Sequence, residues 1–119
     1  MNTRIIHKPN VKENVLDDLS RELPIIISQV MEVPGGNLAI LKPEQIALEF
    51  TPASSRDVGS DIRIMAFARS NDPRASKGND LAKAVLEKVA ALISKSGSAH
   101  SVDIRVYLLE VGAAVHLRS

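Results

Sequence analysis

The stretch from Asp61 to Glu110 constrains the fold of this chain most, because it predicts a strand, an amphipathic helix and a second strand in direct succession. Residues 61–69 and 102–110 alternate between apolar and polar side chains with the period of two that is typical of β-strands. Between them, apolar residues follow the spacing of a single helical stripe: Leu81, Ala82, Val85, Leu86, Val89, Leu92 and Ile93. We therefore expect a helix over about residues 76–94 that ends near Gly97.

The connection between the two strands indicates how they pair. It is about thirty residues long, far more than two antiparallel neighbours need, so it predicts parallel strands with the helix packed on one face of the sheet. One face of both strands is aliphatic and suits that helix. The other face carries charged, aromatic and large apolar side chains: Arg63, Met65, Phe67, Arg69, Asp103, Arg105 and Tyr107.

The first part of the chain repeats this order of elements. It predicts a strand, a helix and a strand at residues 3–8, 11–31 and 46–51. Pro24 lies inside the helical pattern and lacks a backbone donor, so we expect a kink there and a helix that ends near Met31. Residues 52–60 have the composition of a loop, and the segment 112–119 is expected to add a short edge strand.

The two halves, residues 1–51 and 61–110, form a pseudo-repeat within one expected domain that spans residues 1–119. The predicted fold is α+β: two tandem β-α-β units that form one four-stranded sheet with two helices on one face. Such a sheet leaves its other face bare. Because copies of the same chain can bury that face, the pattern predicts a homo-oligomer.

Composition limits the classes of function. The chain has no cysteine, which excludes disulfides and thiol nucleophiles, and its net charge of +1 with few aromatic residues disfavours nucleic-acid binding. The three histidines lack metal-ligand spacing, so we expect neither a metal nor another cofactor, and only His7 is placed to approach a site. Because the apolar runs are short, we expect a soluble, cytoplasmic protein without membrane contact.

Three features together resemble the tautomerase superfamily over nearly the whole chain. They are the tandem β-α-β units, the passage from Val33-Pro34 to Lys42-Pro-Glu-Gln-Ile-Ala-Leu-Glu-Phe50, and the strand Ile62-Arg-Ile-Met-Ala-Phe-Ala-Arg69 before a long helix. The likeness is greatest to the macrophage migration inhibitory factor and 5-carboxymethyl-2-hydroxymuconate isomerase types and to their bacterial relatives. The resemblance implies a trimeric barrel with sites at subunit boundaries. It also implies keto-enol tautomerisation of small carbonyl acids, with an N-terminal proline as the base.

Asn2 stands at the position of that proline, so the base that the resemblance implies is missing. Because asparagine is bulky, we expect the initiator methionine to be retained, which makes the α-amine of Met1 a weak candidate base. The resemblance places Asp103 and Arg105 at last-strand positions that line the site, and Arg69 at the mouth of the site. Asn2 itself is a further candidate for substrate contact.

Two interpretations of the polar side chains on the bare face stay open. Its arginines are suited to hold a carboxylate in a two-point fork. Alternatively, they pair with Asp103 and Glu49 inside an oligomer interface. Tyr107, the last candidate for substrate contact, is suited to donate a hydrogen bond to a developing enolate oxygen, or it packs in the same interface.

Two functional hypotheses follow. The first is a homotrimer that binds a small keto acid, or a similar anionic carbonyl compound, at subunit boundaries through Arg69 and Arg105. Its tautomerase or isomerase activity is expected to be weak or absent because the proline is missing. The second is a non-catalytic oligomeric scaffold or ligand-binding protein on the same fold.

Overall fold

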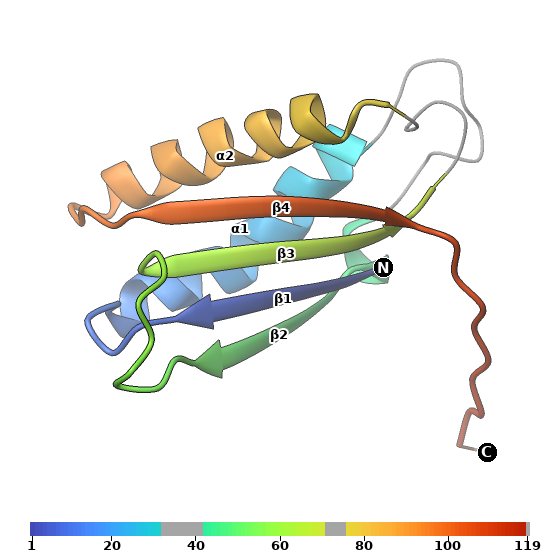
Figure 1. The fold of residues 1–119 in the computed structure, drawn as a ribbon, viewed down its shortest axis with the longest axis horizontal. Helices are drawn as coiled ribbons and strands as arrows, with labels where there is room; N and C mark the ends of the chain where they lie inside the picture. The colour runs from blue at the N-terminus through green and yellow to red at the C-terminus, as the bar shows by residue number, and fades with distance from the viewer. Residues whose placement is uncertain (32–41, 71–75, 119) are drawn as a thin grey trace.

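A computed structural model describes residues 1–31, 42–70 and 76–118. In chain order its elements are β1 (Asn2–His7), α1 (Glu13–Met31), the 3-10 helix η2 (Pro43–Gln45), β2 (Ala47–Pro52), β3 (Ile62–Arg69), α2 (Gly78–Lys95) and β4 (Val102–Leu109). The four strands form one sheet, and α1 and α2 cover the same face of it (Figure 1). The predicted α+β arrangement is therefore confirmed for the described residues.

The sheet has the strand order β2-β1-β3-β4. β1 is parallel to β2, and β3 is parallel to β4, as a helical crossover between each pair requires. The two β-α-β units meet where β1 runs antiparallel to β3, with Ile5 opposite Ile64. β2 and β4 are consequently the two edges of the sheet.

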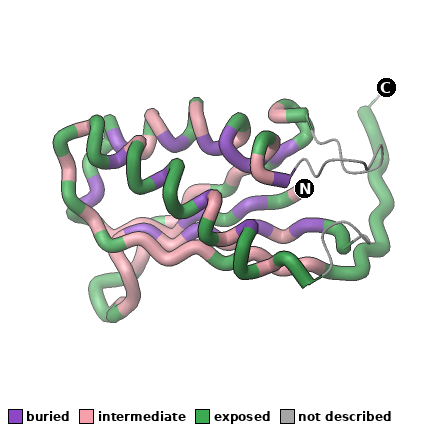
Figure 2. The backbone as a smooth tube through the Cα atoms, turned by 90° about the horizontal axis from the view of Figure 1, so that it is seen from above, coloured by how far each residue is buried: buried purple, intermediate pink, exposed green. Residues whose placement is uncertain are grey.

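The core lies between the helices and the sheet, as the buried positions in Figure 2 show. Alternate strand residues point into it, including Ile5, Ile62 and Ile64, which are fully buried. The helices contribute one stripe each: Val15, Leu19, Leu23, Ile26 and Ile27 from α1, and Leu81, Val85, Val89 and Ile93 from α2. Burial of each such side chain contributes about 1.5–3 kcal/mol to the stability of the fold. The apolar layer between the helices and the sheet therefore holds the two β-α-β units together.

Both predicted helices are present, with small differences at their ends. α1 begins at Glu13, two residues later than expected, and continues through Pro24 to Met31 as one helix. α2 ends at Lys95, and Gly97 follows with a φ of +77°. Its backbone N–H donates to the carbonyl of Ser94 at 3.1 Å, so Gly97 ends the helix as predicted.

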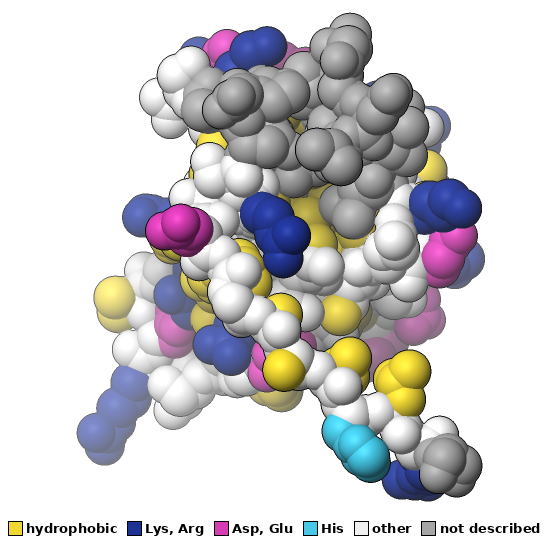
Figure 3. Space-filling model, turned by 90° about the vertical axis from the view of Figure 1, so that its right-hand side faces the viewer, with side chains coloured by type: hydrophobic (Ala, Val, Ile, Leu, Met, Phe, Trp, Pro, Cys, Tyr) yellow, Lys and Arg dark blue, Asp and Glu magenta, His cyan; other side chains and the backbone are white. Residues whose placement is uncertain are grey.

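The prediction of an edge strand at the C-terminal end is wrong for residues 112–118. Residues 110–118 form neither helix nor strand, and every one of them is exposed. Figure 3 shows this segment extending from the body of the molecule with hydrophobic side chains uncovered, among them Val115 at 82% and Leu117 at 77% exposure. After β4 the segment bends away from the sheet (Figure 1), and it does not pair with an edge of its own sheet.

Two further observations complete the fold. The run Val33-Pro-Gly-Gly36 has the composition of a turn, and it lies outside the described residues, as do residues 37–41 and Ser119. Within the described part, no helix is long and apolar enough to cross a membrane.

Candidate functional site

The candidate site lies on the face of the sheet that α1 and α2 leave uncovered, which we call the open face. Side chains alternate along each strand between the core and this open face. Each residue on the open face is therefore next in sequence to a residue that points into the core. The strand register aligns them in three rows across the sheet, from β2 to β4. The first row is Ala47, Asn2, Phe67 and Tyr107, the middle row is Glu49, Arg4, Met65 and Arg105, and the third row is Thr51, Ile6, Arg63 and Asp103.

The first row contains two stacked aromatic rings and borders a hollow with a mixed polar and apolar lining. The rings of Phe67 and Tyr107 are stacked, with their centroids 5.0 Å apart and 11° between their planes. Beside them, a hollow of about 410 Å³ is lined by Asn2, Thr3, Arg4, Ala47, Leu48, Glu49 and Phe67. This arrangement offers a small ligand an apolar surface on one side and hydrogen-bonding groups on the other.

The α-amine of Met1 is held at the start of β1, directly before Asn2. It donates to the carbonyl of Gln45 at 3.2 Å, while the carbonyl of Met1 accepts from the N–H of Ala47 at 2.9 Å. Both contacts come from the junction of η2 and β2. The amine is therefore fixed at the same end of the sheet as the first row.

The middle row carries its charges in pairs. Arg4 contacts the carboxylate of Glu49 at 3.5 Å. At the other end of the row, Arg105 donates through Nε to Asp103 of the third row at 3.3 Å, and this hydrogen bond raises the pKa of Arg105 above its usual value. The arginine that was expected to hold a ligand carboxylate is thus already bound to an acid of its own strand.

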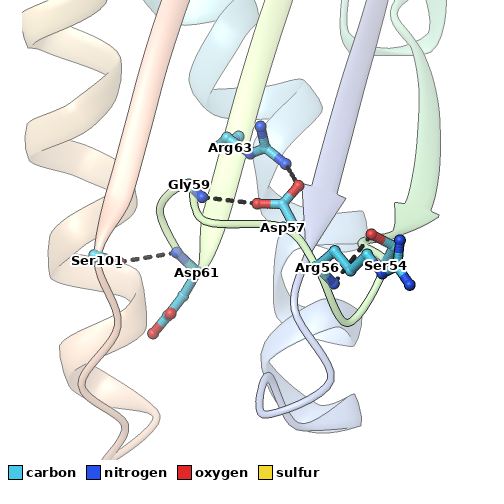
Figure 4. Close-up of polar contacts among 7 residues, drawn as sticks. All are labelled: Ser54, Arg56, Asp57, Gly59, Asp61, Arg63 and Ser101. Atoms are coloured by element: carbon cyan, nitrogen blue, oxygen red, sulfur yellow. Dashed lines mark hydrogen bonds and ion pairs between the residues drawn. The ribbon is translucent and has the colours of Figure 1, made fainter.

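The third row is bordered by the loop between β2 and β3, shown in Figure 4. Asp57 accepts a hydrogen bond from the N–H of Gly59 at 2.8 Å and pairs with Arg63. The hydrogen bond from Gly59, together with the Arg63 guanidinium, lowers the pKa of Asp57 below its usual value of 3.8. Gly59 lies so close to Arg63 that a Cβ at Gly59 would be 3.1 Å from the guanidinium, so only glycine fits without a shift.

A second hollow, of about 350 Å³, opens between this loop and the middle row. It is lined by Ile6, Gly59, Ser60, Arg63, Ile64, Met65, Asp103, Arg105 and Tyr107. Its two arginines are matched by Asp57 and Asp103, so the charges around it balance.

The predicted site residues fall into two groups along the sheet. Met1, Asn2 and Tyr107 lie at the end where β1 begins and β4 finishes, and Arg69, opposite Leu109, lies at that same end (Figure 1). Asp103 is four residues from Tyr107 along β4, a distance of about 13 Å, with Arg105 between them. Only the first group lies at the end of the sheet where the Met1 amine is held.

His7 does not belong to this site. It pairs with Ile62 and Pro52 at the opposite end of β1, five residues or about 17 Å from Asn2. The expectation that it approaches the site is therefore wrong, because the strand carries it away from the first row. Among the described residues, no group of three histidine, aspartate or glutamate side chains is placed to hold a metal ion.

Three residues with a clear place on the open face were not among the predicted site residues. Arg4 and Phe67 line the first hollow, and Asp57 holds Arg63. Arg4 shares the face of Asn2 by simple alternation, so the sequence contained a signal for it. Asp57 had none, because its contact depends on how the loop folds back over β3.

The sheet order and the two helices on one face define a protein with the tautomerase-type fold. No protein-family model matches the sequence, and no curated protein matches it at a significant level. The similarity of this chain to particular proteins is therefore a similarity of three-dimensional structure.

Three solved structures illustrate the likeness. A member of the cis-3-chloroacrylic acid dehalogenase family has a TM-score of 0.66 at 12% identity, with 92% of this chain and 76% of that chain covered. A fused 4-OT, an asymmetric trimer, has a TM-score of 0.61 at 12% identity, with 95% and 92% covered. A macrophage migration inhibitory factor-like protein from Entamoeba histolytica has a TM-score of 0.58 at 13% identity, with 92% and 88% covered. The predicted resemblance is confirmed at the level of fold.

Proposed function

We propose that this protein is a tautomerase-like homotrimer that binds a small anionic carbonyl compound at its subunit boundaries and has weak or absent keto-enol tautomerase activity. The observation that carries the proposal is the hollow of the first row, which adjoins the start of β1 and combines Asn2 and Arg4 with the ring of Phe67. The shared fold supports it, and one of the similar structures is described as a trimer.

The side chains around this hollow suit a keto acid. A guanidinium binds a carboxylate in a two-point fork, and Arg4, which contacts Glu49 at 3.5 Å, is the arginine that lines the hollow. Arg69 lies two residues beyond Phe67 on the same strand face and supplies a second cation at this end of the sheet. Arg105 and Asp103 border the next hollow, where a ligand acid would compete with Asp103 for the guanidinium.

Proton transfer in this proposal depends on the Met1 amine. The hydrogen bond to the Gln45 carbonyl orients the amine, and in its neutral form the lone pair is available to accept a proton. Tyr107 lies beyond Phe67 in the first row and outside the lining of this hollow, so a hydrogen bond from its hydroxyl to the enolate oxygen requires a ligand that reaches past the Phe67 ring. Because Asn2 replaces the proline that the family resemblance implies as base, the expected rate is low.

The test is the ketonisation of phenylenolpyruvate, followed by its ultraviolet absorbance. The wild-type rate is expected to lie close to that of buffer. In Asn2→Pro, processing of Met1 exposes a secondary amine, and the rate is expected to rise by about 10²-fold, the lower end of general-base catalysis. Asn2→Ala is the matched control, because it also loses Met1 but exposes a primary amine, and it is expected to stay near the wild-type rate. A wild-type rate equal to that of proline-bearing tautomerases would refute the proposal.

The ion pairs of the open face favour a second candidate, a non-catalytic oligomeric scaffold or ligand-binding protein. Arg4, Arg63 and Arg105 each contact an acid of the same chain, so their charges are satisfied without a ligand. Calorimetric titration with phenylpyruvate separates the first candidate from the scaffold. Binding that is weakened in Arg4→Met supports the first, whereas a stable oligomer without measurable binding supports the scaffold.

A further inference from the structure

The two edges of the sheet carry opposite charges at the same height. Glu49 lies on β2 and Arg105 lies on β4, and the register places both in the middle row. Their side chains are 62% and 65% exposed, so both reach beyond the protomer surface. Within the middle row, the sheet therefore has an acidic side chain at its β2 edge and a basic side chain at its β4 edge.

A ring of sheets brings these two ends together. When the strands run along the axis of a cyclic assembly, the β2 edge of one copy faces the β4 edge of the next, and rotation about the axis preserves height. β2 and β4 also run in opposite directions within the sheet, so two copies meet with antiparallel edges. Glu49 then lies opposite Arg105 of the neighbouring copy.

We infer that a salt bridge between Glu49 of one copy and Arg105 of the next determines how copies of this chain assemble. The inference rests on the homo-oligomer of the proposed function and names the residues that select its partner. No contact inside the protomer has to break. Arg4 and Glu49 of one copy would continue into Arg105 and Asp103 of the next as a row of alternating charges.

The surface beside β4 supports this assignment. A hollow of about 450 Å³ follows this edge and is lined by Gly78, Asn79, Ala82, Asp103, Ile104, Arg105, Val106 and Tyr107. Arg105 borders it, so an acidic side chain from a neighbouring β2 edge finds both space and a guanidinium there. The pair of Arg105 with Asp103 is a solvent-exposed ion pair, and such pairs are weak, so Arg105 can accept a second carboxylate at little cost.

Charge reversal tests the salt bridge. Size-exclusion chromatography with light scattering is performed on wild type, Glu49→Arg, Arg105→Glu and the chain that carries both substitutions. We expect each single variant to dissociate at a concentration at least about 10-fold higher than wild type, and the double variant to recover, because its charges are again opposite across the boundary. Glu44→Arg, the same change on an exposed residue of η2, is the matched control and is expected to assemble normally.

The double variant separates this inference from effects inside one chain. Each substitution places like charges beside Arg4 or Asp103, so an effect confined to the protomer makes the double variant worse than either single one. A monomeric wild type would overturn the oligomer of the proposed function together with this inference. An oligomeric wild type whose single variants assemble normally, or whose double variant does not recover, would overturn the inference alone.

Crosslinking provides a second measurement that does not depend on charge. The chain has no cysteine, so Glu49→Cys and Arg105→Cys introduce unique thiols. The two positions are separated by three strand spacings, about 14 Å, within one sheet, so a direct disulfide within one chain is impossible. A short thiol crosslinker is expected to join chains of the doubly substituted protein and to leave each single variant uncrosslinked. Absence of joined chains in the assembled double variant would contradict the edge-to-edge contact.

Discussion

Asp57 is the residue that attaches the loop between β2 and β3 to the open face. It accepts from the N–H of Gly59 and pairs with Arg63, and neither contact follows from the position of Asp57 in a loop of mixed composition. Single residues of this kind are the least predictable part of the fold. Alternation along β1 places Asn2 and Arg4 on one face with certainty, whereas a loop side chain finds its partner only when the loop has folded.

The lowered pKa of Asp57 predicts a pH-dependent contribution to stability. Because the folded state favours the carboxylate, this contribution is fully present above pH 3.8 and is lost as the pH falls through the lower pKa of the folded protein. Asp57→Asn is therefore expected to have a lower free energy of unfolding than wild type at neutral pH, and the difference is expected to shrink below pH 3.8. Urea denaturation at a series of pH values measures it.

Ser55→Ala, in the same exposed loop, is the control and is expected to keep the wild-type pH dependence. A difference between wild type and Asp57→Asn that stays constant as the medium is acidified would show that the carboxylate of Asp57 is not responsible for it.

At the scale of the element, both helices follow from their apolar stripes, and Pro24 is the one local conflict. The sequence predicted a kink within a helix that ends near Met31, and α1 runs as one helix from Glu13 to Met31 with Pro24 inside it. Leu23, Ile26 and Ile27 are buried on either side of the proline. Their packing against the sheet keeps the helix together although one backbone hydrogen bond is missing.

Pro24→Ala is expected to stabilise the protein. Alanine restores the N–H that donates to the carbonyl of Ser20, and after allowance for the more flexible unfolded chain we expect the free energy of unfolding to rise by about 2 kcal/mol. Chemical denaturation measures the change. Gln29→Ala, an exposed position of the same helix, is the control and is expected to alter stability by less than about 0.5 kcal/mol. Loss of stability in Pro24→Ala would indicate that the core is shaped around the proline.

At the scale of the whole molecule, the open face remains uncovered by any element of the described chain. It mixes half-buried apolar and aromatic side chains (Ile6, Met65, Phe67 and Tyr107) with charges that are paired within the chain. A sheet face that leaves such apolar side chains uncovered is typical of a protein interface. Light scattering is therefore expected to give about three times the monomer mass of 12.9 kDa at micromolar concentration. A mass of one chain under these conditions would contradict the assembly.

The amino-acid sequence by itself determined the two β-α-β units, the parallel pairing within each of them, and the face to which each strand residue belongs. These properties depend on local periodicity and on the length of a connection, which are written in neighbouring residues. The same alternation was enough to place Arg69 and Tyr107 on one face of the sheet.

Only the tertiary structure decided how the two units join. The antiparallel pairing of β1 with β3 aligns Asn2 with Phe67 and Tyr107, and it carries His7 to the opposite end. It also sets Glu49 and Arg105 at matching heights on the two edges. Such relations join segments far apart in the chain, so they depend on the register that buries the most apolar surface in the shared core, and no local pattern contains that information.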